Sequence, residues 1–236
     1  MSPTTTARHR FMSASASHHA SKGLIALSRR QTAGEEVANA ISHGTGLVAA
    51  LTGAPLLIVA AAQARHPAML VGACVFAGAI LLTYLCSTLY HALPHGRGKQ
   101  WLRLLDHLAI FLLIAGSYTP FTLGVLKGAW GWALFGTVWA LAVAGMVLKI
   151  TGGIRHPRLS TGLYLVMGWL VLAAAQPLWE RMPFPALLWL AAGGLAYTAG
   201  VPFFAADERM RFGHFVWHLF VLAGTTCHFM AVFHCV

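Results

Sequence analysis

Charge is scarce in this sequence. Of its 236 residues, only 9% are charged, whereas 58% are hydrophobic. Soluble domains have about a quarter charged residues, so this chain could not cover a surface of its own in water. The composition excludes an ordinary soluble protein and indicates one domain, or one bundle of helices, in a membrane.

Acidic residues are the rarest charged group. There are 6 Asp and Glu against 16 Lys and Arg, which gives a net charge of +10. The basic residues lie near the N-terminus and in short loops between apolar runs, with no aromatic residues interleaved among them. This distribution indicates membrane topology and contact with anionic lipids, so we expect membrane lipids as partners and no nucleic acid.

The sequence also lacks the patterns of a disulfide framework and of a secretory signal. The four cysteines show no C-x-x-C spacing and lie in or beside apolar segments, so we expect buried free thiols and no disulfide framework. Residues 1–33 are rich in Ser, Thr, Ala and Arg and lack the apolar core of about 7–15 residues that a secretory signal needs. We interpret them as a flexible cytoplasmic tail that precedes one membrane domain over 34–236.

What the chain has instead is a series of apolar runs, each near the length of about 20 residues that a spanning helix needs. Turn-forming residues separate them. The runs predict seven transmembrane helices, at about 36–62, 69–91, 104–126, 130–150, 160–179, 184–204 and 214–235. The expected fold is an all-α membrane protein, a seven-transmembrane helix bundle.

The basic residues predict the orientation of this bundle. Of the 16 Lys and Arg, only Arg65, Lys127 and Arg181 fall on the side of the membrane opposite the N-terminal tail. Because basic loops stay in the cytoplasm, we expect a cytoplasmic N-terminus and an outer C-terminus.

Three histidines point to a metal site. His214 and His218 are four residues apart at the start of the last helix, so both imidazoles can face one cation. They could also be interfacial histidines bonded to their neighbours. His91 ends the second helix, and the predicted topology brings it to the same cytoplasmic face. Three histidines with one open position are the arrangement of a catalytic Zn²⁺.

Asp106 and Ser87 reach the same membrane depth. A zincin helix has Glu directly after its first histidine, but Phe215 stands there. Asp106, at the start of the third helix, could therefore hold or deprotonate a water that the metal binds. It could equally be an acid paired with Arg103 or the helix dipole. Ser87 lies one turn below His91 and could be a packing hydroxyl.

Polar residues also occur within the first helix and farther along the last one. Glu36, Asn39 and His43 repeat at helical spacing in the first helix and could line the same cavity, although Glu36 could be only a first-turn acid. His228 comes ten residues after His218, about 15 Å along a helix, so it cannot share that metal.

With these residues in view, the sequence resembles the hemolysin III family, the bacterial branch of the adiponectin and progestin receptor group. The resemblance covers about residues 35–236. The matching motifs are Glu36-x-x-Asn39-x-x-x-His43-Gly44, Ser87-x-x-x-His91, Asp106-x-x-x-Ile110, Gly116-Ser117-Tyr118-Thr119-Pro120, and His214-x-x-x-His218 with His228 beyond.

The resemblance implies a seven-helix protein of the bacterial cytoplasmic membrane with a cytoplasmic N-terminus. It implies zinc held by His91, His214 and His218, with Ser87 and Asp106 as motif residues and the aspartate reaching the metal through water. It also places the family near the alkaline ceramidases, in a wider set of proposed metal-dependent membrane hydrolases.

Three functions follow from these observations. The one we favour is an enzyme that hydrolyses an amide or ester bond in a lipid, with zinc polarising the carbonyl, Asp106 positioning water and Ser87 stabilising the oxyanion. A cytolytic pore would need a polar stripe across the whole bilayer, whereas the ionisable residues gather at one end. A receptor-like protein with a structural zinc is the third. No G-x-x-x-G face predicts an oligomeric state.

Overall fold

The structure is a computed structural model, and it describes residues 29, 31–152 and 157–236. Arg155 and most of the predicted tail lie outside the described residues. Over the described ranges the chain forms helices and turns without a strand. Residues 31–236 form one compact unit.

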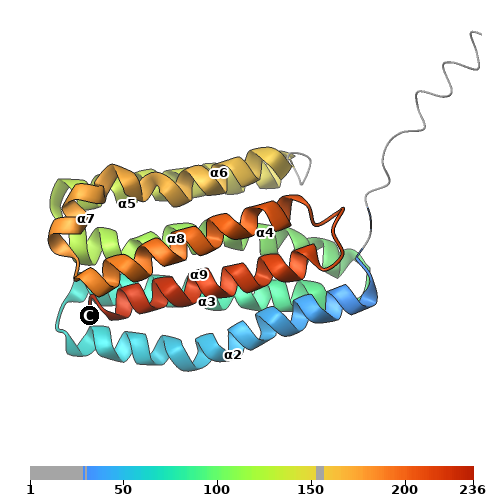
Figure 1. Cartoon of the computed structure of the whole chain (residues 1–236), viewed down its shortest axis with the longest axis horizontal. Helices are drawn as coiled ribbons and strands as arrows, with labels where there is room; N and C mark the ends of the chain where they lie inside the picture. The colour runs from blue at the N-terminus through green and yellow to red at the C-terminus, as the bar shows by residue number, and fades with distance from the viewer. Residues whose placement is uncertain (1–28, 30, 153–156) are drawn as a thin grey trace, which may run out of the picture. The chain divides into compact units, whose positions relative to one another are not determined.

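Among the described residues, seven helices are long and apolar enough to cross a membrane, which confirms the predicted all-α fold. Two are compound: α4 continues as the π-helix η1, and α6 continues through the 3₁₀-helix η3 into α7 (Figure 1). The elements are α2 (Ala33–Gln63), α3 (Pro67–Ala92), α4 (Arg97–Thr119), η1 (Pro120–Leu126), α5 (Gly128–Gly152), α6 (Pro157–Trp169), η3 (Leu170–Ala174), α7 (Ala175–Arg181), α8 (Phe184–Ala205) and α9 (Gly213–Phe233).

The helix starts follow from local capping. Thr32 and Glu35 form a capping box at the start of α2. His66 caps α3 by accepting from the Met69 N–H, and Pro67 stands at the first position, where no amide donor is needed. The sequence prediction is wrong for α4, which begins at Arg97 and not near residue 104. Its polar first turn is anchored because Lys99 is buried and donates to the Leu93 carbonyl.

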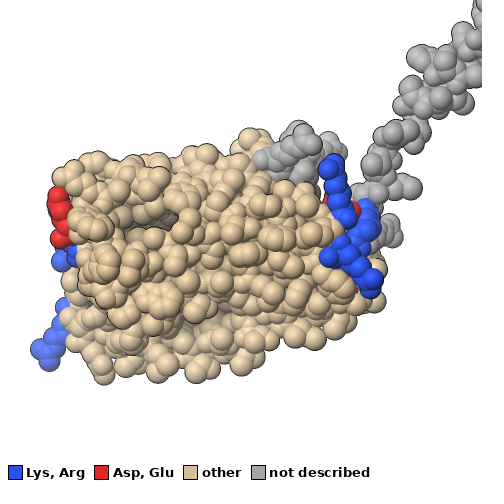
Figure 2. All heavy atoms as spheres, viewed as in Figure 1, with Lys and Arg blue, Asp and Glu red and all other residues tan. Residues whose placement is uncertain are grey.

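The outer surface suits a lipid environment. Large hydrophobic side chains are exposed along the helices, as are Trp101, Trp130, Trp132 and Trp179 near helix ends. Charged side chains gather at the two ends, and the face between them lacks charge in the view of Figure 2. Exposed apolar residues of this kind would be a liability in water but are the expected boundary with acyl chains.

The same surface explains the cysteines. All four are free, and Cys86 is buried as predicted. The prediction is wrong for Cys74, which is exposed on α3. An apolar thiol gains little by turning inward when the outside is itself apolar.

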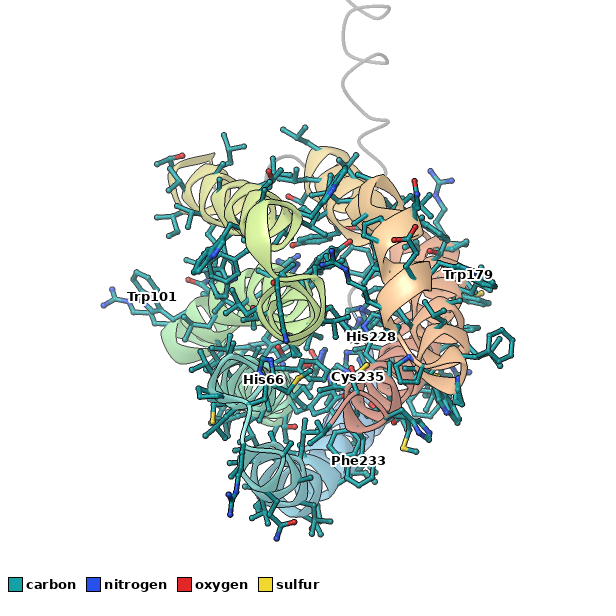
Figure 3. The ribbon with its side chains drawn as sticks, turned by 90° about the vertical axis from the view of Figure 1, so that its left-hand side faces the viewer. His66, Trp101, Trp179, His228, Phe233 and Cys235 are labelled. Carbon is teal, nitrogen blue, oxygen red and sulfur yellow. The ribbon has the colours of Figure 1, made fainter. Side chains whose placement is uncertain are left out.

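The helices are arranged as a ring in chain order. Each packs on its neighbour in sequence, α6 also contacts α8, and α9 closes the ring by packing on both α8 and α2. Viewed along the helices in Figure 3, the ring surrounds an interior into which His228 projects, whereas Trp101 and Trp179 point outward. The ring brings α2, α3, α4 and α9 around one interior space.

A tyrosine explains why α6 does not continue as a regular helix. The Tyr118 hydroxyl of α4 donates to the Met167 and Gly168 carbonyls and accepts from the Val171 N–H, each at 2.8 Å. An inserted side chain of this kind interrupts the helical ladder while satisfying the freed backbone groups. The interruption falls where Gly168 and Trp169 line an internal cavity.

Candidate metal centre

Three histidines from two helices converge inside the ring. His91 ends α3, and His214 and His218 lie in the first two turns of α9. One ring nitrogen from each lies within 4.8 Å of the others, so the group could hold one metal ion. His91 and His218 are buried, and the His214 side chain is 11% exposed.

Each of the three rings is oriented by a partner at Nδ1. His91 Nδ1 lies 2.7 Å from Glu36 Oε2, and His214 Nδ1 lies 3.1 Å from Asp207 Oδ2. Because a carboxylate only accepts, these bonds place the proton on Nδ1. Nε2 of both rings then keeps its lone pair for a metal.

His218 is oriented in the same way by neutral groups. Its Nδ1 lies 3.0 Å from Ser42 Oγ and 3.3 Å from the Asn39 carbonyl. Ser42 donates its own proton to that carbonyl at 2.8 Å, so its oxygen is free to accept from His218. In all three histidines Nε2 is therefore the nitrogen left for a metal.

A partly buried ion pair lies behind His91. Glu36 Oε1 lies 2.9 Å from Lys99 Nζ, while the other carboxylate oxygen holds His91. Lys99 also lies over the Tyr90 ring, 4.9 Å from its centroid. The lysine keeps the carboxylate charged, and a charged carboxylate strengthens the histidine as a ligand.

The surroundings of His91 Nε2 show whether a metal would fit at this site. His91 Nε2 is buried and has no hydrogen-bond partner among the described residues. Leaving such an atom unpaired costs free energy, and a cation at the meeting point of the three rings would satisfy it. Neutral imidazoles suit zinc and several other transition metals, so the donor set fits a metal without naming it.

The start of α9 is what places His214 and His218. Phe212, before the first helical residue, has φ 58°, a left-handed conformation that is rare for a large side chain. Its N–H donates to Glu35 Oε1 at 2.8 Å. A residue of the first helix thus fixes the last helix at the site.

Asp106 and Ser87 lie close to the histidines in different ways. Asp106 is 8% exposed and lines the same cavity as His214 and His218. Ser87 is fully buried one turn below His91, and its hydroxyl makes no hydrogen bond to any described residue within ordinary geometry. Asp106 Oδ2 lies 3.8 Å from His107 Nδ1, too far for a strong pair.

The three helix-α2 candidates separate into two positions. His43 lines the cavity and stacks on His218, with ring centroids 3.5 Å apart and planes within 9°. Glu36 and Asn39 lie behind His91, and Asn39 Nδ2 is 3.5 Å from His91 Nδ1. Neither nitrogen of His43 has a hydrogen-bond partner among the residues that the structure describes.

The cavity extends from the histidines into the apolar part of the ring. Its volume is about 110 Å³, and its walls are largely hydrophobic. Its lining includes Trp169 of α6 and Thr198 of α8, and Figure 2 shows the outer surface hollowed in the region between these helices. The Trp169 Nε1–H donates to Thr198 Oγ1 at 3.1 Å across this gap. A buried polar site at one end of an apolar cavity is typical of a site for an amphipathic molecule.

Comparison with known proteins identifies the family. The family model described as "Haemolysin-III related" matches residues 31–229. The chain belongs to the haemolysin-III-related family. Hemolysin-3 of Bacillus cereus is 40% identical over 198 residues, which are 84% of this chain and 90% of that protein.

Two more relatives extend the haemolysin-III-related group. The Hemolysin-3 homolog of Bacillus subtilis (strain 168) is 42% identical over 203 residues, covering 86% of this chain and 95% of its own. The human monocyte to macrophage differentiation factor is 26% identical over 212 residues, 86% of this chain and 85% of its own. No solved structure matches this haemolysin-III-related chain.

Several residues of the site were missed by the sequence analysis. These residues are Asp207, Lys99, Ser42 and Glu35. His107, next to Asp106, also lines the cavity. An acid in a short loop just before a histidine pair was the one clue that could have identified Asp207.

Proposed function

We propose that this protein is a zinc-dependent hydrolase that cleaves an amide or ester bond in a membrane lipid. It works from the cytoplasmic face of a bacterial cytoplasmic membrane. The observation that carries the proposal is the convergence of three oriented histidines, two of which line one end of an apolar cavity. A soluble substrate would not need that cavity, and a purely structural zinc site would be closed on all sides.

The residues divide the chemistry among them. His91, His214 and His218 hold the ion, which when bound supplies the Lewis acidity that polarises a carbonyl and activates water. Asp106, on the cavity wall beside His214, orients the attacking water through Oδ and takes its proton. The buried Ser87 hydroxyl, which lies beside Asp106, donates to the developing oxyanion.

The apolar part of the cavity holds the acyl chain. The lipid enters sideways, through the hollow between α6 and α8, so its headgroup stays at the membrane interface while its carbonyl reaches the histidines. Packing around the chain excludes bulk water, which strengthens the electrostatic interactions at the carbonyl.

The test is turnover of long-chain ceramides and other N-acyl lipids by the purified protein in lipid nanodiscs. We expect release of free fatty acid, and loss of that release in the His214→Ala/His218→Ala double variant. Asp106→Asn is the sharper variant: it should abolish turnover while zinc content and melting temperature stay as in the wild type. Turnover that persists in Asp106→Asn, or no turnover of any lipid by the zinc-loaded wild type, refutes the proposal.

The names of the Bacillus relatives favour a second candidate, a cytolytic protein. Against it, the acidic and histidine side chains that line the cavity among the described residues lie around the metal centre, except for His228 at its far end. Dye release from liposomes separates the two candidates. Leakage at low protein-to-lipid ratio, unaffected by Asp106→Asn, would favour lysis over hydrolysis.

A further inference from the structure

A histidine lies at the far end of the cavity, away from the metal centre. His228 projects from α9 into the ring (Figure 3) and lines the same cavity as His214 and His218. Both of its ring nitrogens are buried, and neither makes a hydrogen bond of good geometry to a described residue. The Leu190 carbonyl is near the ring but does not meet that geometry. In the apolar part of a membrane protein such a group is costly and marks function.

Helices α8 and α9 leave space for the His228 imidazole. A Cβ on Gly193 of α8 would lie 2.1 Å from His228 Cδ2, so the ring occupies the space that the missing side chain leaves. In return, Tyr197 of α8 lies over Gly224 of α9, where a Cβ would come within 2.7 Å of its ring. The Tyr197 and His228 rings meet edge to face, with centroids 5.4 Å apart. The absence of side chains at Gly193 and Gly224 therefore fixes the position of His228, directly and through Tyr197.

The wall between the two polar ends is largely apolar. Ile110, Ile114 and Val221 line the cavity between the metal centre and His228. His228 is ten residues beyond His218 on one helix, about 15 Å along the axis. A ligand that spans both ends needs one polar group at the metal centre and an apolar chain that runs from it. A second polar group, about half-way along that chain, would lie at His228.

The hydrogen-bonding capacity of the His228 imidazole limits the kinds of group that could be the second polar group. A neutral imidazole has one donor and one acceptor nitrogen, whichever tautomer is present. A hydroxyl both donates and accepts, so it pairs with either nitrogen. Tyr197 is not available for this, because its hydroxyl is 2.7 Å from Thr225 Oγ1. A charged group is disfavoured because no acidic or basic side chain lines that end of the cavity among the described residues.

We propose that His228 is a specificity-determining residue that hydrogen-bonds a mid-chain hydroxyl of the bound lipid. The substrate class is then a lipid whose acyl chain is hydroxylated near its middle, with its carbonyl at the metal centre. This inference rests on the proposed function for the position of the carbonyl. It adds a preference among acyl chains that the metal centre cannot supply.

Ricinoleic acid and oleic acid test it, because they share chain length and double bond and differ in one mid-chain hydroxyl. Both are titrated by calorimetry into the zinc-loaded full-length protein in detergent. We expect ricinoleic acid to bind about three- to tenfold more tightly, the size of one neutral hydrogen bond. His228→Phe keeps a flat ring over Gly193 and should make the two affinities equal. His234→Phe, which removes an exposed histidine from the end of the same helix, should keep the preference.

Equal affinities in the wild type, or a preference that survives in His228→Phe, overturn the inference. Since the wild-type comparison needs no variant, poor folding of His228→Phe leaves the inference testable, and His228→Leu is the second variant. If the wild type binds the two acids equally but still hydrolyses ceramide, only the hydroxyl preference is refuted. Binding of neither acid refutes the acyl cavity, whereas loss of turnover with the preference intact refutes hydrolysis and leaves the cavity.

Discussion

Nδ1 of His91 lies 2.7 Å from the Glu36 carboxylate, although 55 positions separate the two residues in the chain. Replacing Glu36 by Gln removes the charge that strengthens His91 as a ligand. We expect zinc affinity to fall by about 10–100-fold, as for other outer partners of ligand histidines. Competition with a chromophoric chelator measures it. Glu180→Gln, at the exposed end of α7 where Glu180 bonds only Gln176 in the described structure, is the control. An unchanged affinity in Glu36→Gln would mean that the carboxylate does not act through His91.

Removing the metal should destabilise only those proteins of a matched set that keep all three histidines. A ligand that binds only the folded state raises its stability in proportion to the logarithm of its excess over Kd. We therefore expect a chelator to lower the melting temperature of the wild type and of His234→Ala, whose histidine is exposed. His91→Ala and His218→Ala should melt lower already and not respond to the chelator. A response in either variant would place the metal elsewhere.

Gly193 and His228 should be coupled in stability. Gly193→Ala drives a methyl group into the His228 ring, and overpacking of this kind costs about 1–3 kcal/mol. The adjacent Gly194→Ala is the matched control, because a Cβ there meets nothing within 4 Å. In a double-mutant cycle, Gly193→Ala with His228→Ala should recover most of the loss. Additive losses would show that the ring does not occupy the space over Gly193.

The crossing of α3 and η1 makes a second prediction about stability. A Cβ on Gly72 would lie 2.5 Å from Pro120 Cα and 2.8 Å from its nitrogen. Because these are backbone atoms, they cannot move as a flexible side chain can, and we expect Gly72→Ala to cost at least about 1–3 kcal/mol. Gly78→Ala on the same helix, with nothing within 4 Å, should be neutral or slightly stabilising. Thermal unfolding in detergent measures both, and equal melting temperatures would contradict the close crossing.

The orientation is testable with end fusions. The distribution of basic residues predicts the N-terminus in the cytoplasm and the C-terminus outside. A C-terminal alkaline phosphatase fusion should be active and a C-terminal green fluorescent protein fusion dark. The opposite pair of results would put the histidines at the outer face, and with them the proposed reaction.

The fold was predictable because each helix needs only a long apolar run, and each run is visible in the sequence. The boundaries of α4 and the break in α6 were not. The break depends on Tyr118 of another helix entering the ladder of α6, and no local pattern in α6 announces it. Likewise α4 starts early because Lys99 finds partners on α2 and at the end of α3.

For the site, spacing was enough to find the three histidines, since two share a helix face and the topology supplies the third. The partners of those histidines were less visible. Glu36 could be either a helix-capping acid or a functional one until its distance to His91 was known. Asp207 looks like any acid in a turn until the left-handed Phe212 directs α9 back toward α2. Such partners are set by tertiary geometry, which periodicity does not contain.

The candidate ligands and their partners come from α2, α3, α9 and the loop before α9, whereas α6 and α8 contribute none among the described residues. Both α6 and α8 nevertheless line the cavity. On the proposed function, substitutions on the cavity-facing sides of these two helices would change which lipids bind while metal affinity stays the same.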